Sequence, residues 1–339
     1  MHIPQYWAQA RLRHETGRRH GATVQRWGWS DTSQQHAEDH ARERAEQALR
    51  QLQQPPGQRN LAPGFKRQEW LGEYGLNGAT PIREEVLQRR GDAVLTRNSY
   101  GAHCLNTEQV AIADLDFAFP QPGGRFPWLA AIVLLAIALA LIFLHGFGNA
   151  VLNVIAAVVA VLCLRSLTRW SNRRASTQSQ PPLPGNTQQA MELVQRLHGA
   201  HPDWGLRVYE TPKGLRVMLT HCTLAPQASE VQTLFAELRA DPVYRLLCEQ
   251  QQCFRARVSG KPWRMGLASL PTAERRWPLP PHREAARRQW TAHYDHQARR
   301  FAACRLLQQL GSPRMPPEIQ AFVQWHDEAS QAESSLPLA

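Results

Sequence analysis

Residues 110–118 read VAIADLDFA, an apolar strand pattern that two aspartates interrupt near its end. Successive side chains of a β-strand point to opposite faces, so Ile112, Asp114 and Asp116 share one face. Carboxylates that continue a buried apolar face are costly unless something compensates their charge. Two explanations stay open. Either Asp114 and Asp116 bind a divalent cation, or they mark the exit of the strand into solvent and pair with arginines.

Helix and strand patterns surround this stretch without strict alternation, which indicates an α+β fold. On the N-terminal side, residues 5–15 and 22–30 read as two strands joined by a turn. The next segment predicts a helix with a stripe of small residues at helical spacing: Ala37, Ala41, Ala45 and Ala48. A short helix is expected near residues 81–90, followed by strands that turn at residues 99–101.

The C-terminal side continues the mixed pattern. A helix is expected over residues 187–198, and residues 204–222 read as a β-hairpin that turns at residues 212–214. Further helices are expected over residues 229–238, 241–251, 281–310 and 317–327, with a strand that reads CFRARV from Cys253.

An uncharged apolar stretch separates the two sides. Between Arg125 and Arg165 no residue carries a full charge, and the runs Trp128–Leu144 and Ala150–Leu164 flank the break HGFGN. One bilayer crossing needs about 20 apolar residues, so residues 126–165 predict a transmembrane helical hairpin. Arginines flank this hairpin on one side of the membrane only, which puts both termini in the cytoplasm. We therefore expect a bacterial inner-membrane protein, held in the lipid bilayer of the plasma membrane.

The expected domain organisation follows from this insertion. Residues 1–124 and 187–311 form two parts of one cytoplasmic α+β domain, because each side supplies only a few strands. Residues 166–186 form a polar, proline-rich linker, and residues 312–339 form a C-terminal helix and tail. The two ends of an antiparallel helical hairpin lie close together, so a domain accommodates such an insertion easily.

The composition favours anionic partners. The chain of 339 residues has a formal net charge of +11, almost all of it from arginine. Anionic lipid, nucleic acid and nucleotides suit such a balance, although the excess charge also serves solubility alone. The segment GKPWRMG, residues 260–266, mixes basic and aromatic residues as nucleic-acid surfaces do, and contact with a bilayer interface explains it equally well.

The cysteines point to a reducing compartment, because the six of them are scattered without a disulfide pattern. Zinc is one interpretation of His221, Cys222, Cys248 and Cys253. Their spacing lies outside the usual structural zinc patterns, however, and cysteines often serve as small buried apolar side chains.

A strand that ends Asp-x-Asp, followed by a hairpin that reads ETPKGLRVMLTH, resembles the core of the archaeo-eukaryotic primase–polymerase superfamily. This resemblance implies that Asp114 and Asp116 bind Mg²⁺ or Mn²⁺ and that the hairpin contacts nucleotide phosphates. Where that superfamily has Gly-x-His, this chain has Arg216 at the third position. We therefore take Arg216, Arg255 and Arg257 as candidate anion-binding residues.

Over most of its length the chain more closely resembles a group of uncharacterised two-span membrane proteins of proteobacteria. The segments that carry this resemblance are RWGWSD, TRNSYGAHCLNT, ADLDF, GLRVMLTH and CFRARVSGKPWRMG. That group implies a location and no activity. Two functions are therefore expected: binding of a protein partner or an anionic ligand by the basic domain, or a membrane-tethered, metal-dependent phosphoryl-transfer or nucleotide-binding enzyme that uses Asp114 and Asp116.

Overall fold

The structure is a computed structural model, and it describes residues 1–16, 20–54, 69, 81–118 and 183–339. Within these ranges the chain has an α+β fold with three antiparallel sheets. It divides into two units, of which the first comprises Met1–Asp116 with Asn186–Ala339 and the second Phe117–Gly185. Every helix and strand named below belongs to the first unit.

The N-terminal element is a ββα arrangement. Strands β1 (Tyr6–Thr16) and β2 (His20–Ser30) pair antiparallel, and helix α1 (Gln34–Gln53) packs on one face of this pair. The predicted alanine stripe is confirmed, since all four alanines are buried. A Cβ atom at Gly28 would lie 2.1 Å from the backbone nitrogen of Ala41, so the helix and the strand approach closely only because residue 28 is glycine.

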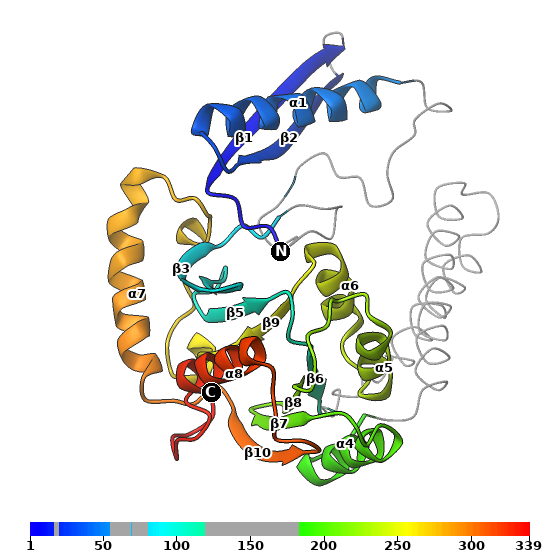
Figure 1. Ribbon diagram of the computed structural model, residues 1–339. Helices are drawn as coiled ribbons and strands as arrows, with labels where there is room; N and C mark the ends of the chain where they lie inside the picture. The colour runs from blue at the N-terminus through cyan, green and yellow to red at the C-terminus, as the bar shows by residue number, and fades with distance from the viewer. Residues whose placement is uncertain (17–19, 55–68, 70–80, 119–182) are drawn as a thin grey trace, which may run out of the picture. The chain divides into compact units, whose positions relative to one another are not determined.

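A second sheet has the strand order β3 (Glu85–Arg90), β4 (Ala93–Arg97), β5 (His103–Thr107) and β9 (Phe254–Arg257). Figure 1 shows helix α7 (Glu284–Ala298) alongside this sheet. The short helix predicted near residues 81–90 is wrong, because most of that segment is β3. Gly91 adopts a positive φ of 55° and reverses the chain, so that β3 pairs with β4. This pairing satisfies the backbone better than an isolated polar helix would.

The third sheet has the strand order β10 (Arg305–Leu310), β7 (Leu206–Thr211), β8 (Gly214–Leu219) and β6 (Ile112–Asp116). Every residue of β8 is buried, so this strand runs through the core. Helices pack around the sheet: α4 (Thr187–Ala200), α5 (Ser229–Glu237), α6 (Pro242–Gln251) and α8 (Pro317–Ser330). The predicted β-hairpin that turns at residues 212–214 is confirmed.

The long helix predicted over residues 281–310 is wrong in its second half. Helix α7 ends at Ala298, and the last residues of the segment form β10, which pairs antiparallel with β7. The edge of β7 supplies hydrogen-bond partners that a local sequence pattern does not reveal. Tertiary pairing therefore overrides the helical spacing of these residues.

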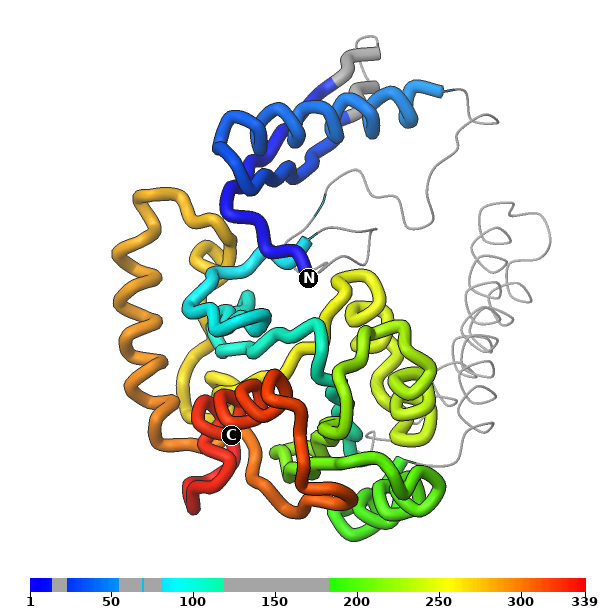
Figure 2. The backbone as a smooth tube through the Cα atoms, viewed as in Figure 1, coloured from blue at the N-terminus to red at the C-terminus, as the bar shows by residue number. Residues whose placement is uncertain are grey.

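Two of the sheets combine strands from distant parts of the chain. Strand β5 pairs with β9, and β6 pairs with β8, so each pair joins a strand before residue 117 to one after residue 185. The backbone trace in Figure 2 shows β6 meeting the segment of β7 and β8. The consequence for function is that side chains on β6, β8 and β9 share one neighbourhood.

The fold class and location expected from the sequence need correction. Within the described ranges, no helix is both long and apolar enough to cross a bilayer. The longest of these helices, α1, has 20 residues, but charged side chains such as Glu43 and Arg50 cover its exposed face, whereas a span needs about 20 apolar residues. The expected hairpin, residues 126–165, and most of the expected linker lie outside the described residues. With no spanning helix among the described residues, the expected fold of an α+β domain with an inserted transmembrane hairpin is corrected to an α+β fold, and neither the hairpin nor the inner-membrane location is retained.

Candidate functional site

The register of β6 and β8 places Asp114 directly opposite Arg216. The Arg216 guanidinium donates to both carboxylate oxygens of Asp114, at 2.8 and 3.2 Å. The Arg216 side chain is only 3% exposed, whereas the Asp114 side chain is 43% exposed. Burial lowers the pKa of Arg216, but the Asp114 carboxylate outweighs this effect, so the pKa of Arg216 is raised. The pairing of Asp114 with an arginine, one of the two explanations of the sequence, is therefore present.

This pairing bears on the metal hypothesis. A cation bound by Asp114 would compete with the guanidinium for the negative charge of the same carboxylate. Within the described ranges, no group of three or more His, Cys, Asp or Glu side chains is arranged to hold a metal ion. Binding of Mg²⁺ or Mn²⁺ by Asp114 and Asp116 stays a prediction.

Asp116 has different surroundings from Asp114. It is exposed at the end of β6, opposite Gly214 at the start of β8. Partial burial raises the pKa of Asp116, and the neighbouring carboxylates of Asp114 and Asp241 raise it further, while Lys213 and Lys261 lower it. The charge of Asp116 therefore interacts both with neighbouring carboxylates and with a group of cations.

These cations come from three separate elements, and we call them the basic cluster: Lys213, Arg257, Lys261 and Arg264. Lys213 lies in the turn between β7 and β8, Arg257 ends β9, and the other two lie at the 3₁₀ turn Pro262–Arg264. Burial lowers the pKa of Lys261, and the positive charges of Arg257, Arg264 and Lys213 lower it further, with Asp116 opposing them. The pKa of Arg264 is lowered in the same way, first by burial and then by Arg257. The fold therefore holds like charges together.

Hydrogen bonds of the backbone fix the loop that carries half of the basic cluster. The N–H of Arg264 donates to the carbonyl of Lys261 at 2.9 Å, and the N–H of Met265 donates to the carbonyl of Pro262 at 3.0 Å. Met265 is buried and anchors the loop. Arg257 donates to the carbonyl of Ser259 at 2.6 Å, which ties β9 to the same loop. These bonds thus fix the backbone that carries Lys261 and Arg264, and the Arg257 side chain.

An exposed tryptophan adjoins the basic cluster. Trp263 is 53% exposed, although it is one of the largest apolar side chains of the molecule. The Lys261 Nζ lies 5.5 Å from the centroid of its ring, and the Tyr100 ring lies 5.5 Å away at an interplanar angle of 57°. Cations and an aromatic face are therefore presented side by side.

The three arginines predicted to bind anions lie in two different environments. Arg216 and Arg255 form ion pairs inside the molecule, the second with the buried Glu84 at 2.6 Å. Their positive charges are already balanced by carboxylates of the chain. Of the three, Arg257 belongs to the basic cluster.

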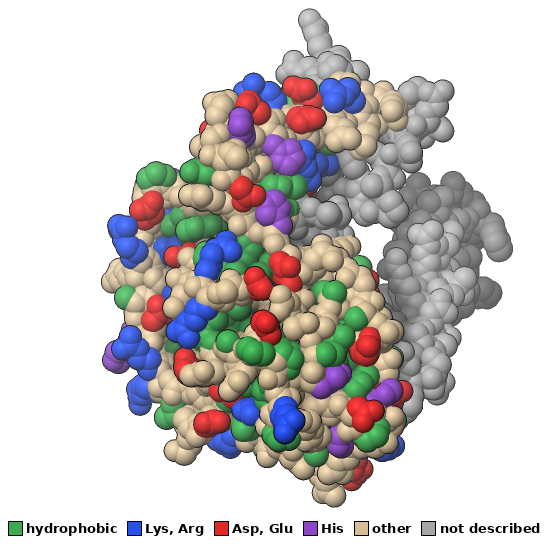
Figure 3. Space-filling model, in the orientation of Figure 1, with side chains coloured by type: hydrophobic (Ala, Val, Ile, Leu, Met, Phe, Trp, Pro, Cys, Tyr) green, Lys and Arg blue, Asp and Glu red, His purple; other side chains and the backbone are tan. Residues whose placement is uncertain are grey.

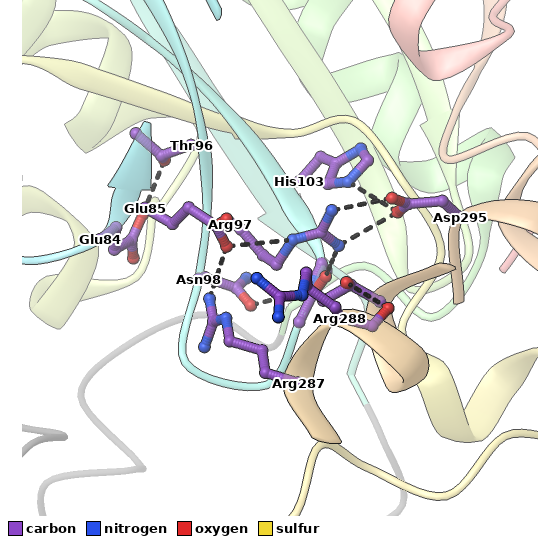
Figure 4. A network of polar contacts seen from close by, with 12 residues as sticks. Glu84, Glu85, Thr96, Arg97, Asn98, His103, Arg287, Arg288 and Asp295 are labelled. Carbon is purple, nitrogen blue, oxygen red and sulfur yellow. Dashed lines mark hydrogen bonds and ion pairs between the residues drawn. The ribbon is translucent and has the colours of Figure 1, made fainter. Parts of the chain in front are cut away.

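A separate charged network ties α7 to the sheet of β3, β4, β5 and β9. Figure 4 shows Arg97 of β4 reaching Asp295 of α7, with two hydrogen bonds of 3.1 and 2.9 Å. Glu85 accepts from Arg287 at 2.7 Å, and the Nε2 of His103 lies 3.1 Å from Asp295. Each charge in this network faces an opposite charge. We therefore assign it a structural role in holding α7 against the sheet.

A Cys–His–Asp arrangement lies behind β8 on the side of α8. The Cys304 Sγ is 3.9 Å from the Nε2 of His326, whose Nδ1 is 2.9 Å from Asp327. Burial raises the pKa of the Cys304 thiol, but His326 and Arg216 lower it by more, so the net direction is downward. Both Cys304 and His326 are nevertheless completely buried. A nucleophilic cysteine needs access to its substrate, and this arrangement offers none.

The residues of the zinc interpretation are not arranged as a metal site. Cys248 and Cys253 are buried apolar-like side chains near the end of α6, whereas His221 stacks at 5.8 Å on Trp204. A groove of about 1020 Å³ lies between β10 and α8, but the guanidinium of Arg207 inside it already donates to Asp327, Tyr209 and Gln309. Neither place rivals the basic cluster as a binding site.

Sequence reasoning found part of the basic cluster. The segment GKPWRMG contains Lys261, Trp263 and Arg264, and its mixture of basic and aromatic residues is the signal that singled it out. It missed Lys213, which a tight hairpin turn exposes 48 residues earlier in the chain, and no local pattern indicates that this lysine comes close enough to Lys261 to lower its pKa. On the face shown in Figure 3, basic and acidic side chains are interspersed, so the net charge is not gathered there.

Comparison of the chain with protein-family models, with curated proteins and with solved structures gave no match. The two resemblances drawn from its motifs therefore stay predictions, and the chemistry of the described residues is what bears on function.

Proposed function

We propose that this chain binds a phosphate-bearing anion at the basic cluster. The observation that carries the proposal is the placement of Arg257, Lys261 and Arg264 on β9 and the hydrogen-bonded loop that follows it, with Lys213 of a separate hairpin close enough to lower the pKa of Lys261 further. Like charges held together by a fold cost free energy, and a bound anion relieves that cost. Several cations around one place favour a ligand with several negative charges over a single carboxylate.

Substitution of Asp116 distinguishes anion binding by the cations alone from binding through a metal ion. Its carboxylate opposes the effect of the cations on the pKa of Lys261, so it repels an incoming anion. Removing this negative charge therefore strengthens anion binding. If Asp116 instead held a metal ion that binds the phosphate, the same substitution would weaken binding and the binding would require Mn²⁺.

Inorganic tripolyphosphate is a suitable probe, with the full-length chain and its thermal unfolding as the readout. A ligand at about 100 times its Kd stabilises the folded state by about 2.7 kcal/mol. Lys261→Gln and Arg264→Gln should each weaken binding about tenfold, because each removes one charged contact. Asp116→Asn should strengthen it, with EDTA present or absent.

Arg299→Gln is the matched control, because it removes one exposed arginine at the end of α7 and leaves the basic cluster intact. It should bind tripolyphosphate as the wild type does. The proposal fails if the wild type shows no stabilisation, or if Arg299→Gln weakens binding as much as Lys261→Gln does. Two results together would favour the metal-dependent alternative. Asp116→Asn would bind tripolyphosphate more weakly than the wild type, and Mn²⁺ added after EDTA would restore binding to the wild type but not to Asp116→Asn.

A further inference from the structure

We infer that the anion bound at the basic cluster is single-stranded nucleic acid, with one base stacked on Trp263. This inference rests on the proposed function and names its ligand class. It follows from the position of an exposed indole among cations, because a base and its phosphates need both kinds of surface within a few ångströms.

The exposure of Trp263 distinguishes it from tryptophans that serve the core. Trp7 and Trp325 are each 4% exposed, whereas Trp263 is 53% exposed. An exposed indole face loses the burial that stabilises a core tryptophan. A stacked nucleobase would cover that face, and every base offers a flat π-surface for the purpose.

The backbone of the turn that carries Trp263 is fixed before binding. Its neighbour Pro262 is buried and accepts the N–H groups of Met265 and Leu267, which closes the turn. The ring of Tyr100 lies 5.5 Å from the indole, at an interplanar angle of 57°. Little backbone entropy of this turn is therefore lost when a base stacks on the indole.

The distance from the indole to the nearest cation is comparable to the distance between a base and its phosphate in one nucleotide. The Lys261 Nζ is 5.5 Å from the ring centroid, and Arg264 follows Trp263 directly in the chain. A base over the indole thus brings its own phosphate toward these cations. A duplex keeps its bases stacked inside, so it can offer its phosphates but no base face. This difference selects single strands.

The test uses the full-length chain with fluorescently labelled 12-mers of thymidylate and of uridylate, and fluorescence anisotropy as the readout. Inorganic polyphosphate serves as a polyanion without bases, and a 12-base-pair duplex serves as a stacked control. Trp263→Ala should weaken 12-mer binding by about 5- to 150-fold, from the usual contribution of one stacked base, and leave polyphosphate binding unchanged. Trp263→Phe should retain most of the affinity.

Salt dependence separates stacking from charge. Contacts to four phosphates give a slope of log K against log salt of about −2.8 for a single strand, and Lys261→Gln should reduce its magnitude by about 0.7. Trp263→Ala should leave the slope unchanged. Leu307→Ala, which truncates another exposed apolar side chain on β10, is the matched control and should change neither quantity.

The outcomes separate this inference from the proposed function. Equal binding of polyphosphate and 12-mers, equal binding of duplex and single strands, or 12-mer binding unaffected by Trp263→Ala would each overturn the inference and leave anion binding intact. Absence of binding by every one of these polyanions would overturn both. A preference for the thymidylate or the uridylate 12-mer would assign the ligand to DNA or RNA.

Discussion

Neutralising Asp114 should destabilise the protein, because Asp114→Asn leaves the buried guanidinium of Arg216 without its counter-charge. The substitution preserves the shape of the side chain and removes its negative charge. The Arg216 side chain is 3% exposed, and after the change it keeps the carbonyl of Arg257 at 3.0 Å and the His326 Nε2 at 3.3 Å as uncharged contacts in place of the carboxylate. The loss of stability therefore arises mainly from the uncompensated charge of the buried guanidinium and less from the removal of one contact.

The magnitude follows from the unequal burial of the two partners. Breaking a fully buried ion pair costs about 3–5 kcal/mol. Asp114 is 43% exposed, so water screens the pair and reaches the vacated side, which brings the expected loss to about 2 kcal/mol. For a chain of this size, that loss lowers the melting temperature by roughly 3 °C.

Chemical denaturation and thermal unfolding of the full-length chain would measure this loss. Asp116→Asn is the matched control, because it removes a carboxylate two residues away whose pKa is raised by burial and by neighbouring acids. A raised carboxylate pKa means that ionisation disfavours the folded state at neutral pH, so this control should be neutral or slightly stabilising.

A double substitution tests the cause directly. Arg216→Met in the Asp114→Asn background should restore at least half of the lost stability, because an apolar side chain of similar length suits the buried position. Unchanged or increased stability of Asp114→Asn in the absence of metal would refute the reasoning. It would mean that repulsion between Asp114 and Asp116 outweighs the pairing with Arg216.

Three further outcomes are expected. Gly28→Ala should destabilise the packing of α1 on β2 by at least 1–3 kcal/mol in chemical denaturation, because the added Cβ would meet the backbone of Ala41, and an unchanged midpoint would contradict the close approach. Burial raises the pKa of Asp295, but His103 and Arg97 lower it by more, so the net direction is downward. Ionised Asp295 therefore stabilises the folded state above about pH 3.9, the pKa of an unfolded aspartate. This stabilisation is lost as the pH falls through the lowered pKa of the folded state. Asp295→Asn should therefore flatten the acid limb of the stability profile, and a mutant with the wild-type limb would exclude this carboxylate as its origin. Cys304, fully buried, should react with iodoacetamide only after denaturation, as mass spectrometry of the labelled peptide would show.

Local patterns in the sequence determine several elements of this fold. The alanine stripe of α1 and the alternating residues of β7 and β8 each describe a segment by its own periodicity, and the turn residues Pro212 and Lys213 mark where the hairpin reverses. Side-chain spacing and turn chemistry act over a few residues, so the sequence alone carries this information.

Tertiary structure decided the segments whose state depends on a distant partner. Residues 85–90 and 305–310 have spacings that suit a helix, yet each forms a strand because a neighbouring strand edge is available. The apolar stretch that dominated the sequence analysis predicted a membrane protein. That stretch lies outside the described residues, and the described part of the chain contains no helix that is long and apolar enough to cross a bilayer.

The candidate site divides in the same way. The sequence alone marks Asp114 and Asp116 as a pair on one strand face and marks GKPWRMG as a basic and aromatic segment. Only the register of β6 against β8 puts Asp114 opposite Arg216, and only the tertiary fold brings Lys213 close enough to Lys261 to lower its pKa together with Arg257. The physical reason is that charges interact through space, whereas sequence patterns report only neighbours along the chain.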